Sequence, residues 1–342
     1  MQHKLKRGEL LNENGELVEA GYATSLVKTY DRKKIKANKM RIKEWDYYLI
    51  YNDDFGVALT IDDNSYMAMN SFTLLNFKNQ TETTKSFMHV LTNGKTNFPA
   101  TSKSGNVSAK HENYTLEFLN NGKARMLKVW IKNFENGNDL FGEFMLFSEP
   151  KDSMVIATPF AEKKTHFYYN QKIVGFKVKG KIVIGKKVIE FDEPTRAILD
   201  WGRGVWTYKN TWFWGAGAGL VNGKEVGFNI GYGFGDTSAA SENMIFVDGK
   251  AHKLENVTFN IPTNEKGKEE FLKPWTFTSS DGRFEMNFEP VIDRHSNANV
   301  VVISSNQHQV FGKFSGTMIL DDGSKLEIKD FLGFAEKVVN KW

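Results

Sequence analysis

The sequence predicts an all-β protein built from two antiparallel, barrel-like units, and three observations support this prediction. Apolar and polar residues alternate along most of the 342 residues, at the period of a half-buried strand. Aromatic residues make up 13% of the chain, a surplus that suits strands and apolar pockets. Gly, Asn and Asp recur between the short apolar segments, as they do in sandwiches and barrels with tight turns.

The alternating segments are predicted to be strands, in chain order. In the first half they are Trp45–Tyr51, Phe55–Ile61, Tyr66–Phe77, Phe87–Leu91, Tyr114–Leu119, Met126–Phe134 and Phe141–Phe147. In the second half they are Thr165–Asn170, Ile173–Lys179, Ile182–Ile184, Lys187–Phe191, Arg196–Asp200, Thr211–Val221, Glu225–Phe234, Asn243–Val247, Val257–Ile261, Trp275–Thr278, Phe284–Phe288, Val300–Ser304, Val310–Leu320 and Leu326–Lys329. Helix signals are sparse: we expect a short C-terminal helix at Gly333–Trp342 and a weaker one at Ser25–Tyr30.

The dipeptide Asn222-Gly223 predicts a two-residue hairpin turn between two long strands. Both positions of a type I′ turn need positive φ, which Asn and Gly adopt readily. This turn sets a register in which Trp214 lies opposite Gly231 and Phe213 lies opposite Tyr232. One face then carries Trp212, Trp214, Ala216, Gly227, Asn229 and Gly231.

No change in composition marks a linker along the chain. The best candidate boundary is the polar, turn-like stretch at Asp248-Gly249-Lys250. It predicts an N-terminal barrel domain of residues 1–248 and a C-terminal barrel domain of residues 249–342, with exchange of strands between the two allowed.

The composition excludes several classes of protein. The chain has no cysteine, which rules out disulfides, thiolate catalysis, Cys-type zinc sites and iron–sulfur clusters. Its 45 basic and 41 acidic residues leave a net charge of +4, too small an excess to indicate a nucleic-acid partner. No two of the seven histidines are spaced as metal ligands on a helix, and no glycine motif for phosphates precedes a helix. We therefore expect neither a metal nor a cofactor.

Targeting signals are also missing from the sequence. No apolar run approaches the length of about 18 residues that a membrane-spanning helix needs. The N-terminal residues are basic but lack the apolar core of a secretory signal. We expect a cytoplasmic protein with no integral membrane segment.

The segment 198–243 holds the densest group of side chains suited to a binding site. Four of the eight tryptophans fall within fourteen residues there, at Trp201, Trp206, Trp212 and Trp214. Aromatic walls with a few convergent polar groups are typical of small-molecule pockets. We expect Asp200 and Arg203 to act in catalysis, and the ligand to contact Trp206, Trp212, Trp214, Asn229, Glu242 and Asn243.

The position of these residues along the predicted strands supports the expectation. Asp200 and Arg203 follow the strand that ends at residue 200, where a loop can aim them into a barrel mouth. Glu242 and Asn243 follow the glycine-rich strand after a short polar loop, so they can reach the same rim. The alternative is a tryptophan-rich structural core in which Asp200 and Arg203 form a local ion pair.

At these residues the sequence resembles a bacterial family known as domain of unknown function 2804. The resemblance runs nearly end to end and is carried by Glu44–Tyr48, Tyr169–Lys172, Leu199–Trp206, Gly227–Asp236, Pro274–Trp275, Ser280–Arg283, Phe288–Pro290, Asp293–Arg294 and Gln309–Gly312. More distantly, the segment is similar to the carotenoid 1,2-hydratase and AttH-like superfamily, whose pattern is Asp-His-x-x-Gly, a Trp-x-Trp strand and a glycine turn. Here Asp200–Gly204, Trp212–Trp214 and Asn222-Gly223 follow in that order, with Trp201 in place of the histidine.

This resemblance implies two lipocalin-like (calycin-type) barrels and a hydratase or cyclase that needs no cofactor. As an enzyme, the protein would act on a hydrophobic small molecule such as an isoprenoid or polyketide, with Asp200 as the acid. Burial among tryptophans would raise the pKa of Asp200, whereas pairing with Arg203 would lower it. Trp212 and Trp214 would stabilise a developing carbocation. Two alternatives remain: a non-catalytic carrier of a lipid or metabolite, and a protein that processes or binds carbohydrate.

Overall fold

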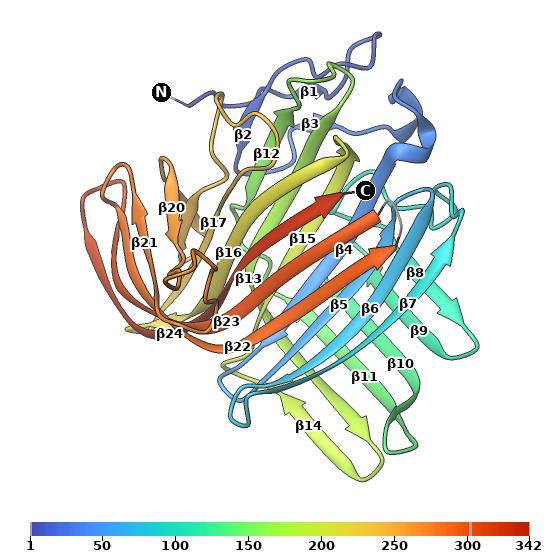
Figure 1. Cartoon of the computed structure of the whole chain (residues 1–342), viewed down its shortest axis with the longest axis vertical. Helices are drawn as coiled ribbons and strands as arrows, with labels where there is room; N and C mark the ends of the chain where they lie inside the picture. The colour runs from blue at the N-terminus through green and yellow to red at the C-terminus, as the bar shows by residue number, and fades with distance from the viewer. Residues whose placement is uncertain (1, 301–302, 342) are drawn as a thin grey trace.

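The computed structural model describes residues 2–300 and 303–341. Within these residues the protein is nearly all β, with two short 3-10 helices, η1 (Arg32–Lys34) and η2 (Lys39–Arg41). Two large antiparallel sheets curl into half-barrels, and β1 (Gly8–Glu9) and β3 (Lys28–Thr29) form a small parallel pair beside them (Figure 1). The all-β prediction with two barrel-like sheets is confirmed.

The first sheet contains thirteen of the described strands. They are β2 (Gly21–Ala23), β4 (Ile42–Tyr51), β5 (Phe55–Asp63), β6 (Met67–Asn76), β7 (Thr81–Val90), β8 (Val107–His111), β9 (Tyr114–Asn120), β10 (Arg125–Glu135), β11 (Asn138–Phe147), β12 (Met154–Pro159), β13 (Phe167–Ile184), β14 (Lys187–Phe191) and β15 (Arg196–Val205). The hydrogen-bonded order is β7-β6-β5-β4-β15-β13-β11-β10-β9-β8, with β2, β12 and β14 joined at its side.

The second sheet contains the nine described strands that follow. They are β16 (Lys209–Val221), β17 (Lys224–Tyr232), β18 (Met244–Val247), β19 (Lys250–Lys253), β20 (Val257–Asn260), β21 (Trp275–Ser279), β22 (Phe284–Val300), β23 (Ile303–Ile319) and β24 (Lys325–Lys341). Their order is β19-β18-β17-β16-β24-β23-β22-β21-β20. The predicted strand 300–304 includes residues 301 and 302, which lie outside the described part of the chain.

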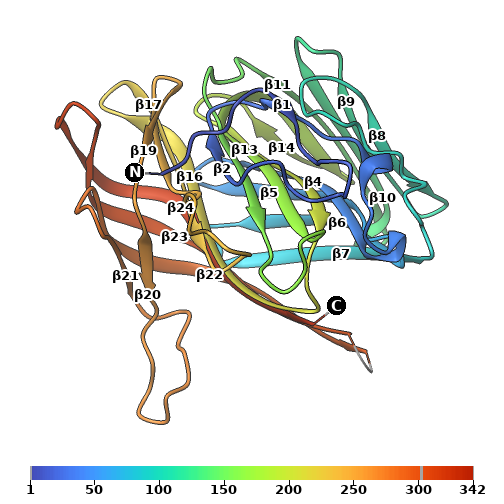
Figure 2. The same ribbon diagram turned by 90° about the horizontal axis from the view of Figure 1, so that it is seen from above.

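The two sheets stand side by side and share an apolar layer. Figure 2 shows the second sheet, yellow to red, next to the first sheet, blue to green. Contact is made where β13 and β15 meet β16 and β17. One core fills the inside of the first half-barrel and includes Tyr48 and Trp201. Another fills the second half-barrel, and a third, with Tyr47, Ile198 and Trp214, lies between the sheets.

The predicted hairpin at Asn222-Gly223 is confirmed. Both residues have positive φ, 50° and 78°. Strands β16 and β17 pair in the expected register, with Trp214 opposite Gly231 and Phe213 opposite Tyr232. Phe213 and Tyr232 stack with their ring centroids 4.6 Å apart. This turn fixes which side chains of the two strands face the first sheet.

The predicted helices are wrong. The segment expected to form a C-terminal helix belongs to β24, and Trp342 lies outside the described residues. Phe334 faces the layer between the sheets and Ala335 faces the second half-barrel, so both faces of this strand are buried. A strand buried on both faces loses polar alternation and resembles a helix in sequence. The segment Ser25–Tyr30 likewise contains strand β3.

The change from the first to the second sheet lies between Val205 and Lys209. Asp248 and Gly249 form the hairpin turn between β18 and β19, inside the second sheet. The division of the chain into two domains at residue 248 therefore stays a prediction. Among the described residues, no helix is long and apolar enough to span a membrane.

Candidate functional site

A cavity of about 210 Å³ lies between the two sheets, which is smaller than the pockets of about 300–1,000 Å³ that hold drug-sized ligands. The first sheet and the residues after it contribute Trp45, Tyr47, Thr60, Asp62, Asn64, Met69, Ser71, Tyr168, Lys172, Asp200 and Trp206. The second sheet and its loops contribute Trp212, Trp214, Phe234, Glu242, Arg294, Ser305, Gln307, Gln309, Glu336, Val338 and Asn340. The cavity therefore lies between the half-barrels and not in the mouth of one of them.

One wall of the cavity is a continuous aromatic surface. Phe234 contacts Tyr168, Trp206 and Trp212 with ring centroids 4.7, 5.2 and 5.1 Å away. Trp45 contacts Trp206 edge-to-face at 5.3 Å and stacks on Tyr168 at 6.0 Å. These rings come from both sheets, so the wall forms only when the sheets are assembled. Such a surface suits a ring or an unsaturated hydrocarbon.

The position of Trp45 in this wall depends on a glycine of the neighbouring strand. Gly202 lies opposite Trp45 in the β4–β15 pair, and a Cβ at residue 202 would collide with the indole ring. We expect Gly202→Ala to destabilise the protein by about 1–3 kcal/mol through overpacking. Trp45→Leu should remove the collision. The double variant should therefore lose less unfolding free energy, measured with urea, than the sum of the losses in the two single variants. Additive losses would contradict this contact.

The polar wall begins with an ion pair at Asp200. The Lys172 ammonium lies 2.7 Å from Asp200 Oδ2, and Asn170 Nδ2 donates to Asp200 Oδ1 at 2.6 Å. Both members of the pair are buried, with side chains 4% and 9% exposed. The same ammonium lies 3.8 Å from the centroid of Trp214, whose ring face it covers. That face of Trp214 is therefore not available to a ligand cation.

Glu336 is a buried carboxyl group of the cavity wall that accepts hydrogen bonds from three side chains. Its Oε1 accepts from Trp212 Nε1 at 3.1 Å, and its Oε2 accepts from Gln307 and Gln309 at 3.3 and 3.1 Å. Burial raises the pKa of Glu336 to about 7, although the Trp212 hydrogen bond and Lys172 oppose this shift. Oε1 accepts a single hydrogen bond, so its second lone pair can carry a proton. At neutral pH the acid and its base are thus both populated.

The pKa values of two further carboxyl groups in the cavity are also raised. Burial raises the pKa of Asp62 to about 7, against hydrogen bonds from Met69 and Asn64. Burial also raises the pKa of Glu242, against the nearby Lys172 and a hydrogen bond from Asn229. The cavity therefore collects acids that hold their protons more tightly than carboxyl groups in water.

The raised pKa of Glu336 makes stability depend on pH. A carboxyl group that ionises at pH 4.5 when unfolded and near pH 7 when folded favours folding while it is protonated. Its contribution is lost as the pH rises from 4.5 to about 7. We expect the unfolding free energy of the wild type, minus that of Glu336→Gln, to fall by about 3 kcal/mol across this window. Urea titrations at several pH values measure it, and a constant difference would contradict the shift.

Five of the eight residues expected at the site line the cavity: Asp200, Trp206, Trp212, Trp214 and Glu242. Asn229 and Asn243 lie behind the lining and support it. Asn229 Oδ1 accepts from Trp214 Nε1 at 2.8 Å, and Asn243 Oδ1 accepts from the backbone N–H of Gly231 at 2.7 Å. Their roles in ligand binding stay predictions.

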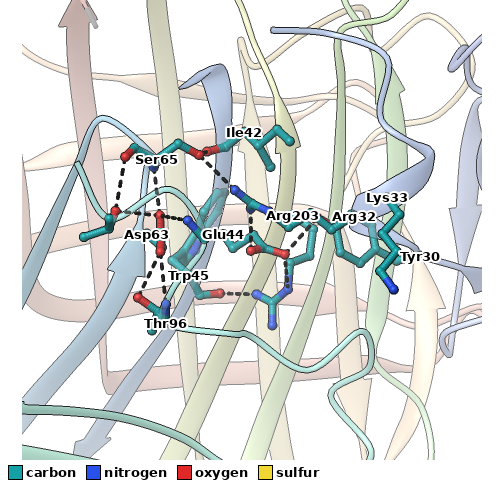
Figure 3. A network of polar contacts seen from close by, with 12 residues as sticks. Tyr30, Arg32, Lys33, Ile42, Glu44, Trp45, Asp63, Ser65, Thr96 and Arg203 are labelled. Carbon is teal, nitrogen blue, oxygen red and sulfur yellow. Dashed lines mark hydrogen bonds and ion pairs between the residues drawn. The ribbon is translucent and has the colours of Figure 1, made fainter. Parts of the chain in front are cut away.

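Arg203 lies on the other face of the sheet, in a buried network (Figure 3). Its Nη1 donates to Asp46 Oδ1 at 3.0 Å, and its Nε lies 4.0 Å from Glu44 Oε1. Glu44 also receives a hydrogen bond of 2.6 Å from Arg32. Among the described residues, the Asp200–Arg203 ion pair of the structural-core alternative does not form, since Asp200 pairs with Lys172.

Strand parity explains why Asp200 and Arg203 do not reach the same site, as the sequence predicted. The predicted strand ends at residue 200, but β15 continues to Val205. Asp200 and Arg203 therefore lie within one strand, three residues apart, where side chains point to opposite faces. Glu336 is absent from the predicted site because its strand was expected to be a helix. As a strand, the segment places Glu336, Val338 and Asn340 on one face, and this signal is present in the sequence.

Within residues 2–300 and 303–341, no group of three or more His, Asp or Glu side chains is placed to hold a metal ion. The acids of the cavity are instead distributed along its walls. Each one is bound by amide, indole or ammonium donors of the protein.

The chain is similar to one protein family and to several solved structures. A family model described as a domain of unknown function (DUF2804) matches residues 2–342. An AttH-like protein of Nitrosomonas europaea has a similar structure, with 12% identity, a TM-score of 0.55 and coverage of 92% of this chain and 98% of that chain. Kievitone hydratase from Nectria haematococca shows 10% identity and a TM-score of 0.46 over 98% of each chain. No curated protein matches the sequence. The similarity to the Nitrosomonas europaea structure shows a shared double-barrel fold.

Proposed function

This chain belongs to the DUF2804 family, and we propose that it is an acid–base enzyme that hydrates or cyclises a small unsaturated molecule held between its two sheets. The observation that carries the proposal is Glu336, a buried carboxylic acid with a pKa of about 7 in an aromatic-lined cavity. General acids work best when their pKa lies near the working pH, because they can then both give and recover a proton.

The two walls of the cavity indicate the kind of substrate. The aromatic wall, with Trp45, Trp206 and Phe234, suits a flat or branched hydrocarbon. The facing side chains, among them Gln307 and Gln309, suit an oxygen-bearing part of the same molecule. The proposed substrate is a hydrophobic molecule with at least one double bond and one polar group, as in isoprenoids and polyketides.

The proposed reaction starts with protonation of the double bond. The π electrons form a C–H bond with the proton of Glu336, whose O–H bond breaks, and the neighbouring carbon becomes cationic. In a hydration, a water molecule forms the C–O bond and its proton returns to Glu336. In a cyclisation, the π electrons of a second double bond form the ring-closing C–C bond and leave a new cationic carbon. A C–H bond next to that carbon then breaks, its electrons form a double bond, and its proton passes to Glu336. Trp212, which donates to Glu336, holds the carboxyl group in place and leaves its ring face next to the developing cation.

In this proposal the proton donor is Glu336, and not Asp200 as expected from the sequence. An aspartate paired with an ammonium at 2.7 Å is poorly suited to donate a proton. Asp200 instead neutralises Lys172 and holds it over Trp214. The Lys172–Asp200 pair is then part of the polar wall of the cavity and takes no part in proton transfer.

The experiment uses labelled solvent, because solvent atoms mark the product even when the substrate has not been identified. The protein is incubated with a small-molecule extract of its own cells, in deuterium oxide enriched in heavy oxygen, and products are followed by mass spectrometry. A hydratase adds both labels to one compound, and a cyclase adds deuterium alone. A compound that is retained by the protein without any label would show a carrier, and would overturn the enzymatic proposal.

A further inference from the structure

Two cations of the described chain line the cavity, and they differ in their partners. Lys172 pairs with Asp200 at 2.7 Å. Arg294 is half-buried and forms no ion pair among the described residues. Its polar contact there is a hydrogen bond of 2.9 Å from Nη1 to Gln309 Oε1. A charge that is partly removed from water without a counter-charge is costly, so this guanidinium marks a position suited to an anion.

Strand parity directs Arg294 toward the cavity. In β22, Ile292 packs in the apolar layer between the sheets, and Arg294 lies two residues further along on the same face. Asp293 and His295 face the opposite side, where they line a separate groove. Nε and Nη2 of Arg294 have no hydrogen-bond partner in the described part of the chain, and neither nitrogen is fully buried. Both nitrogens can therefore donate to a ligand.

Arg294 lies in one row of the sheet with the proposed proton donor. It pairs with Gln309 of β23, which in turn pairs with Glu336 of β24. Neighbouring strands are about 4.8 Å apart, so roughly 10 Å separates the backbones at Arg294 and Glu336. The Gln309 amide joins the two side chains, since it accepts from Arg294 at 2.9 Å and donates to Glu336 Oε2 at 3.1 Å. One small molecule can therefore contact both Arg294 and Glu336.

We propose that Arg294 binds a carboxylate group of the substrate, with Nε and Nη2 donating to its two oxygens. The planar edge of a guanidinium matches a carboxylate in shape and in charge. A diphosphate would bring more negative charge than one unpaired guanidinium can balance, next to the carboxyl group of Glu336. The inference rests on the proposed function and deepens it, because the substrate becomes a small unsaturated carboxylic acid.

The test compares cyclohexanecarboxylate with cyclohexanecarboxamide, which have the same ring and a similar shape but differ in charge. Both are saturated, so neither can be protonated at a double bond. Binding is measured by calorimetry at about pH 6, where the acid probe is ionised and Glu336, with a pKa of about 7, is mostly protonated. We expect the wild type to prefer the carboxylate at least about tenfold, and Arg294→Gln to lower this preference to within about twofold.

Lys337→Gln is the matched control. Lys337 follows Glu336 in β24, but its side chain faces away from the cavity and pairs with Glu269 at 2.6 Å. The substitution removes the same charge from the same sheet without changing the cavity. We expect the preference to stay within about twofold of the wild type, since salt screens the distant charge. Circular dichroism establishes that each variant is folded.

A second measurement needs no variant of Arg294. Burial raises the pKa of Glu336, and the charge of Arg294 opposes this rise. A bound carboxylate neutralises Arg294, so carbon NMR of the Glu336 carboxyl group should show a higher titration midpoint with the carboxylate than with the carboxamide. An equal midpoint with the two probes would contradict binding at Arg294.

The inference is overturned if the wild type does not prefer the carboxylate, or if Arg294→Gln keeps the preference. It is also overturned if Lys337→Gln loses the preference equally, since the effect would then reflect overall charge. Tighter binding of cyclohexyl phosphate than of the carboxylate would assign the site to phosphate and overturn it as well. A failure of the enzymatic proposal is recognised separately, by the absence of solvent label in products of the wild-type protein.

Discussion

Glu336→Gln is expected to lower the rate of solvent-label incorporation by about a hundredfold to ten-thousandfold, the usual contribution of a general acid. Glutamine has the shape of a protonated glutamate and can still accept from Trp212, so the fold and the cavity should persist. It has no proton to transfer at neutral pH. The measurement is the rate at which the labelled product appears under equal protein concentration and equal extract.

A matched control lies on the same strand. Glu327 is exposed, and its side chain accepts only a weak hydrogen bond of 3.3 Å from Thr317 among the described residues. We expect Glu327→Gln to keep the wild-type rate. If Glu336→Gln also kept it, Glu336 would not be the proton donor, and the role would pass to Asp62 or Glu242, the other acids of the cavity whose pKa is raised by burial.

Breaking the Lys172–Asp200 pair should give the largest loss of stability. Lys172→Met leaves Asp200 buried with Asn170 as its remaining partner, and we expect the unfolding free energy to fall by about 3–5 kcal/mol. The penalty comes from the carboxylate that stays behind without a counter-charge. Lys172→Met together with Asp200→Leu should recover most of the loss, because two apolar side chains leave no buried charge. Urea unfolding of the three proteins measures this.

An exposed pair provides the comparison for that result. Lys110 and Glu117 form an ion pair of 2.6 Å, with side chains 60% and 23% exposed. Removing Lys110 should cost less than about 1 kcal/mol, since water screens the charges. If the double variant at residues 172 and 200 were as unstable as Lys172→Met alone, the loss would come from packing and not from charge.

Local sequence signals were sufficient for the hairpin and its register. Asn222-Gly223 fixes the turn through backbone geometry, and the period of two then places Trp212 and Trp214 on one face. The same reasoning failed for Asp200 and Arg203, because it depends on knowing where a strand ends. The glycines and the continuous burial of β15 hide that end in the sequence.

Long-range pairing explains why the main acid of the site could not be located from sequence. Glu336 meets Trp212 across 124 residues of chain, through the pairing of β16 with β24. Lys172 reaches Asp200 from a neighbouring strand of the first sheet. Neither contact leaves a local pattern. The cavity itself depends on how two sheets meet, which short sequence motifs do not encode.

The most direct test of the proposed mechanism is the titration of Glu336 itself. NMR of protein with isotope-labelled glutamate carboxyl groups can follow each side chain through its pH titration, with Glu336→Gln to assign the signal. We predict a carboxyl signal with a midpoint near pH 7 that is missing from the variant. A midpoint near the ordinary value of 4.5 would contradict the mechanism, because Glu336 would then be ionised at neutral pH and could not supply the proton.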